Sequence, residues 1–181
     1  MAPIPRHHPL WRYFSGLVES TFCAQVGLCD PVLTDYLSEL LVSFTHMDQM
    51  QMLRNARGKT LEQVASMLTV LFDERPISPV DRDCIVYRHI GDYVLFWAGL
   101  YPEQLRRIHC DSPDLLPTYV VQGKRSYATV AELSADDAEP PAMLFRNLSE
   151  DFESCVYGLG LVRRDLEANE AAGPGEHGLL V

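Results

Sequence analysis

Apolar residues recur every three or four positions along most of the chain, which is the spacing of one face of an α-helix. The spacing predicts helices over residues 10–26, 60–75 and 142–166. It is clearest over 31–53, where the apolar positions are Leu33, Leu37, Leu40, Leu41, Phe44 and Met47. No segment alternates apolar and polar residues between hairpin turns, so we predict no β-sheet.

Prolines mark the starts of several predicted helices. Asp30-Pro31, Ser78-Pro79 and Ser112-Pro113 each place a good capping side chain before a proline, which is favourable at the first helical position. Further helices are therefore predicted over 79–101, over 102–108 and from Pro113 or Pro117 to Leu133.

The second half of the 79–101 segment is apolar on every side, reading Tyr-Val-Leu-Phe-Trp-Ala-Gly-Leu-Tyr from position 93. A helix of this kind is buried on several faces, so we predict it to be the central element. The fold prediction is an all-α, irregular bundle of six or seven helices around this helix. Residues 1–166 are expected to form a single domain, and 167–181 a flexible acidic tail.

Five glycines fall inside predicted helices, where each costs about 1 kcal/mol relative to alanine. They are Gly91, Gly99, Gly123, Gly158 and Gly160. Two explanations stay open for them: close packing of neighbouring helices, or room for a ligand against the backbone.

The charge balance sets aside two classes of partner. The 181 residues include 15 Lys or Arg and 25 Asp or Glu, a net charge of −10, which argues against nucleic-acid or anionic-membrane binding. The excess lies late in the chain: residues 1–129 hold 14 acidic and 12 basic side chains, and 130–181 hold 11 and 3. An electrostatic partner of that end should be basic.

Cysteine usage and the N-terminal residues predict a cytoplasmic protein. Five cysteines, an odd number without a C-x-x-C pair, favour reduced and mostly buried thiols over disulfides or a zinc site. Prolines and histidines over 1–9 replace the apolar stretch of a signal peptide, and the longest charge-free apolar stretch, 93–102, is half of the roughly 20 residues that cross a bilayer. We expect no membrane association and no cofactor.

The most suggestive cluster of polar residues lies on the fourth predicted helix. Arg88, His89 and Asp92 are three or four positions apart, so their side chains can converge near one helical face. A carboxylate beside a histidine can orient the ring and raise its pKa, as a general base requires. The alternative is a surface pair between Arg88 and Asp92 with His89 packed at the boundary.

A second cluster lies on the sixth predicted helix. Lys124 and Arg125, with Tyr127 nearby, form a basic patch that could bind a phosphate or an acidic partner. The pattern of a P-loop is absent, and we prefer pairing within the chain, with the acidic loop at Asp136 and Asp137.

Two further constellations remain open. His46 and Asp48 would form a metal site with His89 and Asp92 if the second and fourth helices were neighbours, but no E-x-x-H motif supports it and we predict no metal. The C-terminal Leu179-Leu180-Val181 either suits a sheet-edge groove in a partner or is an unconstrained end.

The sequence favours a non-catalytic, all-helical binding or adaptor protein that acts through a protein partner or a second copy. GxSxG, HExxH and GxGxxG motifs are absent, and we name no catalytic residue. The alternative hypothesis is a small-molecule sensor or small enzyme with a pocket between the fourth and sixth helices. There His89 would transfer a proton, Asp92 would orient it, and Lys124 or Arg125 would hold an anion, with Tyr127 in the same pocket.

Overall fold

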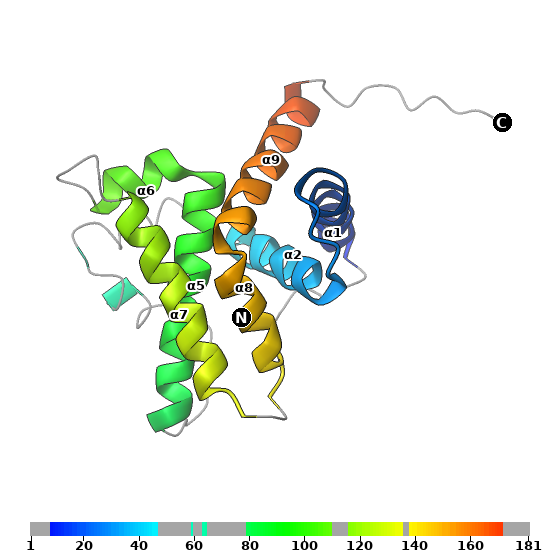
Figure 1. Ribbon diagram of the computed structural model, residues 1–181. Helices are drawn as coiled ribbons and strands as arrows, with labels where there is room; N and C mark the ends of the chain where they lie inside the picture. Colours follow the sequence, from blue (N-terminus) through cyan, green and yellow to red (C-terminus); the bar gives the residue numbers. More distant parts are fainter. Residues whose placement is uncertain are drawn as a thin grey trace.

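The computed structural model describes residues 8–46, 59, 63–64, 79–109, 116–135 and 138–171. Over these residues the chain is helical and contains no strand, and the helices pack against one another, so the prediction of an all-α bundle is confirmed (Figure 1). The elements are α1 (Pro9–Thr21), the π-helical turn η1 (Phe22–Val26), α2 (Pro31–His46), α5 (Pro79–Leu100), α6 (Pro102–His109), α7 (Leu116–Leu133), α8 (Ala142–Glu150) and α9 (Phe152–Ala171).

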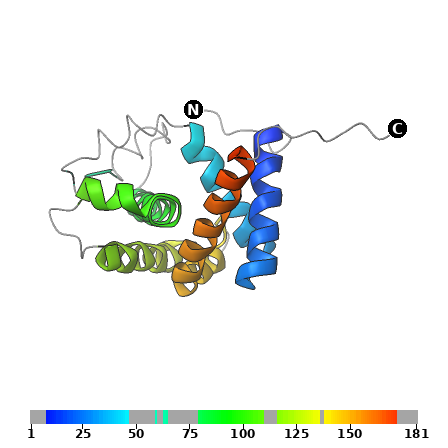
Figure 2. The same ribbon diagram turned by 90° about the horizontal axis from the view of Figure 1, so that it is seen from above.

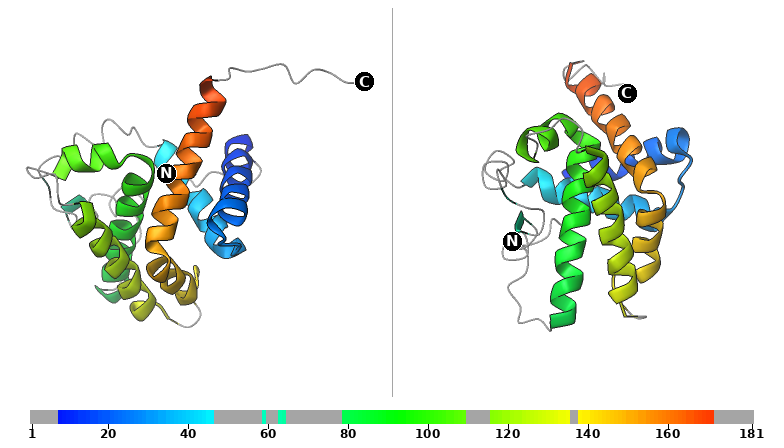
Figure 3. Two further views of the ribbon diagram at one scale, coloured as in Figure 1. Left: turned by 45° about the horizontal axis from the view of Figure 1, so that its top comes forward. Right: turned by 60° about the vertical axis from the view of Figure 1, so that its left-hand side comes forward.

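Helix α5 lies at the centre of the packing. It makes its most extensive contacts with α7 and α9, while α7 also packs along α8, so that α5, α7 and α8 lie side by side (Figure 3). Helix α1 packs on α2 and reaches α9, the last helix of the described chain, as the view from above shows (Figure 2). One continuous cluster of buried apolar side chains connects all of these helices.

The burial of α5 follows its sequence. Every residue from Ile90 to Leu100 is buried, whereas Val80 and Tyr87 in the first half of the helix are exposed. The prediction of a buried central helix is therefore confirmed, and it is the second half of the helix that supplies the burial.

Backbone hydrogen bonds at Gly27 end the first helical segment, and a side-chain cap at Asp30 begins α2. Gly27 has a φ of 83°, a left-handed conformation that glycine adopts without strain, and the amides of Gly27 and Leu28 both donate to the Phe22 carbonyl, at 2.8 and 3.1 Å. Asp30 caps α2 as predicted, since its Oδ1 accepts from the Val32 amide at 2.9 Å. The predicted helix 10–26 is thus α1 followed by η1.

The single helix predicted over 142–166 is wrong in two respects. It is divided at Asp151, where φ is −97° and ψ is 20°, into α8 and α9. The apolar stripe passes through this bend without interruption, so periodicity did not reveal it. Helix α9 also continues past position 166 to Ala171. Within this last part of the helix, Arg163 Nε donates a hydrogen bond to Glu167 Oε1 at 2.7 Å.

Close helix packing explains four of the five helical glycines. Their neighbours are large side chains of the core, which lie where a Cβ atom would have to be placed. A Cβ atom would come within 2.5 to 2.6 Å of a side chain in each case: Gly91 against Tyr127, Gly99 against Leu159, Gly123 against Phe152 and Gly158 against Phe22.

The prediction of mostly buried thiols is wrong for the described cysteines. Cys155 is buried and Cys84 is half-buried, but Cys23 and Cys29 are both exposed. The two exposed residues lie on either side of the turn at Gly27. A turn has no apolar face that packs on the core, so these side chains stay exposed.

Several predictions fall outside the described residues. These are the end of the second helix beyond 46, most of the helix predicted over 60–75, the Ser78 and Ser112 caps, and the tail beyond 171. Of the 60–75 segment, Gln63 and Val64 are helical and Val64 is buried. Among the helices that are described, none has both the length and the apolar character that crossing a bilayer requires.

Candidate functional site

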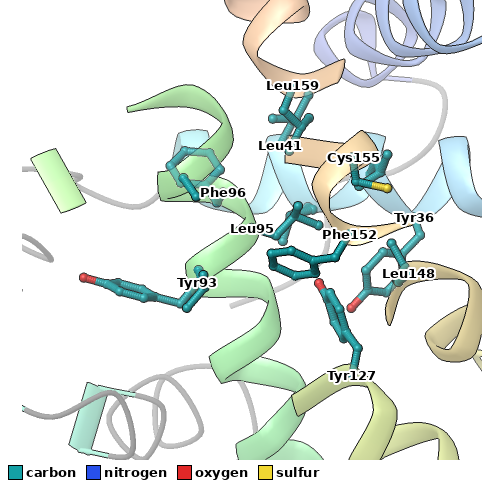
Figure 4. Packing of buried hydrophobic residues seen from close by; sticks show 14 of the residues in the cluster. Tyr36, Leu41, Tyr93, Leu95, Phe96, Tyr127, Leu148, Phe152, Cys155 and Leu159 are labelled. Carbon is teal, nitrogen blue, oxygen red and sulfur yellow. The ribbon is translucent and has the colours of Figure 1, made fainter. Parts of the chain in front are cut away.

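A buried carboxylate joins three helices of the bundle. Asp92 lies on α5 at the start of its buried half, with 7% of its surface exposed. Its Oδ1 accepts hydrogen bonds from the hydroxyls of Tyr36 on α2, at 2.6 Å, and Tyr127 on α7, at 2.7 Å. Figure 4 shows the two phenol groups approaching each other from these two helices. A single oxygen atom is therefore the meeting point of α2, α5 and α7.

Arg88 supplies the opposite charge, one helical turn before Asp92. Its Nε lies 3.8 Å from Asp92 Oδ2 and donates to the Tyr36 hydroxyl at 3.1 Å. The guanidinium also lies over the rings of Tyr36 and Phe145, 5.3 and 5.8 Å from their centroids. Arg88 thus contacts both the charge of Asp92 and two aromatic rings. Because one of these rings belongs to Phe145, Arg88 extends the network to α8.

The environment fixes the phenols as hydrogen-bond donors. Burial raises the pKa of Tyr36 well above its usual value, and the negative charge of Asp92 raises it further. Burial and the Asp92 charge raise the pKa of Tyr127 in the same direction. Both hydroxyls consequently keep their protons at neutral pH, and neither serves as a base or a nucleophile there.

The structure brings together three of the predicted site residues, Arg88, Asp92 and Tyr127. His89 lies beside Arg88 on α5 and is half-buried. The hydrogen bonds at Oδ1 of Asp92 come from two phenols on other helices. This carboxylate therefore helps to hold the helices together, whether or not it also orients the ring of His89. The orienting role of Asp92 toward His89 stays a prediction.

Lys124 and Arg125 lie at the surface. Lys124 Nζ forms an ion pair with Glu153 on the first turn of α9, at 3.0 and 3.1 Å from its two oxygens. The preference for pairing within the chain was right in kind, but the partner is Glu153; the expected partners, Asp136 and Asp137, lie outside the described residues. Arg125 is exposed.

The α5–α7 interface, where the alternative hypothesis placed a pocket, is packed with side chains. The Tyr127 ring lies against Gly91, and Phe152 and Val94 lie against Gly123. Aromatic and aliphatic side chains occupy the space beside the glycines at this interface. They leave no room for a ligand against the backbone.

No cluster of three His, Cys, Asp or Glu side chains in the described part of the chain is arranged to hold a metal ion. The hypothesis of a four-residue metal site needs Asp48, which lies outside that part, and the side chain of His46, which is not described.

Tyr36 is the one member of the network that we did not single out from the sequence. It lies in the apolar stripe of α2 between Leu33 and Leu40, which places a phenol on a buried face. A buried hydroxyl needs a hydrogen-bond partner, and so does a carboxylate at the start of an apolar run. These needs mark Tyr36 and Asp92 as residues that require a partner, but they do not select the two as partners of each other.

Comparison of the chain with models of protein families, with curated proteins and with solved structures found no match in any of the three. The function proposed below is argued from the chain's own residues.

Proposed function

We propose that the protein is a non-catalytic binding protein of the cytoplasm that acts through contacts with another protein or a second copy of itself. The observation that carries the proposal is the engagement of Asp92 by side chains within the fold. Its carboxylate accepts from two phenols and faces Arg88, and it is buried. Two residues of the most suggestive cluster in the sequence, Arg88 and Asp92, are thus engaged by other side chains of the fold.

The surface supplies features suited to a partner. Tyr157 on α9 is 61% exposed and Val121 on α7 is 45% exposed. Val121 precedes Lys124 by three positions and Tyr157 follows Glu153 by four, so each shares a helix face with one member of the Lys124–Glu153 ion pair. These four residues are named the α7–α9 patch. Exposed aromatic and aliphatic groups beside charged ones are typical of protein interfaces.

The charge of the chain supports a protein partner over a nucleic acid. A net charge of −10 repels a phosphate backbone, and none of the described helices is long and apolar enough to span a bilayer. The alternative of a small-molecule sensor or enzyme receives no support from a particular contact, since the α5–α7 interface is packed and Lys124 is held by Glu153.

Light scattering during size-exclusion chromatography, followed by affinity capture from a cell extract, tests the proposal. The test variant is Val121→Ser with Tyr157→Ser. The matched control is Val80→Ser with Tyr87→Ser, which removes the same two residue types from exposed positions on α5. We expect the wild type and the control to form a homo-oligomer or retain the same protein, and the test variant to lose it.

Two results would overturn the proposal. One is a wild-type protein that stays monomeric at all concentrations and retains no protein. The other is a native mass spectrum in which a small molecule, bound by the wild type, is lost on His89→Gln while the melting temperature is unchanged. An association that survives in the test variant would place the interface elsewhere than the α7–α9 patch.

A further inference from the structure

Two exposed thiols meet at the turn between α1 and α2. Cys23 lies in η1 and Cys29 lies immediately before Asp30, the cap of α2. Both are free thiols, and the neighbouring Cys29 raises the pKa of Cys23. The left-handed conformation of Gly27 and the two amides that donate to Phe22 turn the chain back between positions 23 and 29.

We propose that Cys23 and Cys29 are a modification site: a dithiol that low-molecular-weight disulfides, such as glutathione disulfide, oxidise to an intramolecular disulfide. The proposal is independent of the proposed function. Cys155 is buried and Cys84 lies 3.9 Å from the Ser134 hydroxyl, so the exposed pair is the one placed for this chemistry among the described cysteines.

The reaction proceeds in two balanced exchange steps. The thiolate of Cys29 attacks glutathione disulfide, which forms a mixed disulfide and releases one glutathione thiolate. The Cys23 sulfur, once deprotonated, then attacks the Cys29 sulfur and displaces the second glutathione. The pair loses two electrons and two protons, and glutathione disulfide gains them as two glutathione molecules. Interaction with Cys29 raises the pKa of Cys23 to about 11, which leaves little Cys23 thiolate to attack free glutathione disulfide and assigns Cys23 to the second, intramolecular step.

The position of the pair gives the oxidation a structural consequence. Cys23 follows Phe22, whose ring lies against Gly158 of α9, and Cys29 precedes Asp30, whose Oδ2 accepts from Asn147 of α8 at 3.3 Å. A disulfide would join the two points at which this turn is held to the rest of the bundle. Oxidation should therefore raise the resistance of the protein to unfolding.

Peptide mapping by mass spectrometry tests the site. The fully reduced, full-length protein is equilibrated with defined ratios of glutathione disulfide to glutathione, with and without urea, and remaining thiols are alkylated. We expect a Cys23–Cys29 linked species, lighter by two hydrogen atoms, with little lasting glutathione adduct. Because the fold holds the thiols together, the equilibrium constant for the link should be at least ~10-fold higher in the native protein than in urea, where a short flexible tether sets the effective concentration.

Single variants separate the roles of the two thiols. Cys23→Ser should accumulate a stable glutathione adduct on Cys29, because the resolving thiol is missing. Cys84→Ser is the matched control and should behave as the wild type. Stable adducts on both residues of the wild type, a link to another cysteine, or equal equilibrium constants in buffer and in urea would each overturn the proposal.

Discussion

The ring of Tyr127 occupies the space in which Gly91 lacks a side chain. A Cβ atom at position 91 would lie 2.6 Å from Cε1 of that ring, which is closer than real Cβ contacts come. The hydroxyl of the same ring reaches Asp92, the residue after Gly91. Close approach of α5 and α7 and the hydrogen bond to the carboxylate therefore depend on one glycine.

Gly91→Ala should destabilise the protein by about 2 kcal/mol, because overpacking of a rigid, buried ring costs roughly 1–3 kcal/mol and outweighs the better helix propensity of alanine. Urea unfolding followed by circular dichroism measures the change. Gly16→Ala on α1 is the control, since a Cβ atom there meets nothing within 4 Å. That variant should be neutral or more stable by up to about 1 kcal/mol. Equal effects of the two variants would contradict the packing of Tyr127 on Gly91.

Removal of either phenol hydroxyl should show how much its hydrogen bond to Asp92 contributes to the free energy of unfolding. Tyr36→Phe and Tyr127→Phe should each cost about 1.5–3 kcal/mol, the range for a hydrogen bond to a charged group. The double variant should cost more than the sum of the two, because it leaves Oδ1 without either phenol. Tyr157→Phe is the control at an exposed position and should lie within about 0.5 kcal/mol of the wild type. Additive effects would show that the two bonds are independent.

The network also predicts a loss of stability in alkaline solution. Burial and the Asp92 charge raise the pKa of Tyr36 and Tyr127 in the folded state, so their contribution is fully present below the unfolded value of about 10 and is lost as the pH rises toward the folded values. The free energy of unfolding should fall above about pH 10, by up to ~1.4 kcal/mol per pH unit for each phenol. Tyr127→Phe should have a shallower slope, so its curve approaches that of the wild type. Parallel curves would contradict this account of the pKa shifts.

Spacing along α5 predicted part of the site from the sequence alone. Arg88 and Asp92 are four residues apart on one helix, so helical geometry brings them together whatever the rest of the fold does. Tyr36 is 56 residues from Asp92, and its contact depends on how α2 crosses α5. The bend at Asp151 was equally hidden, because a stripe of apolar residues continues on both sides of it. Local periodicity thus predicted the helices, and tertiary packing decided which side chains meet.

The Lys124–Glu153 ion pair gives a test of the anion-binding alternative. Lys124→Met should change stability by less than about 1 kcal/mol, since the pair is exposed on both sides. High salt should reduce this difference further. Glu153→Gln is the reciprocal variant, and a double-mutant cycle measures the coupling. Should Lys124→Met instead abolish binding of inorganic phosphate that the wild type shows in calorimetry, the lysine would be an anion anchor.

Contacts between the two ends of the described chain have a consequence for synthesis on the ribosome. Phe22 is fully buried against Gly158, the Thr21 hydroxyl donates to Asp165 at 3.4 Å, and Asn169 donates to the Tyr13 hydroxyl at 3.3 Å. Helix α9 is synthesised long after α1, so the side of α1 and η1 that faces α9 is covered much later than the side of α1 that packs on α2. During that interval Phe22 lacks the α9 neighbour that helps to bury it, and synthesis of α9 supplies that neighbour.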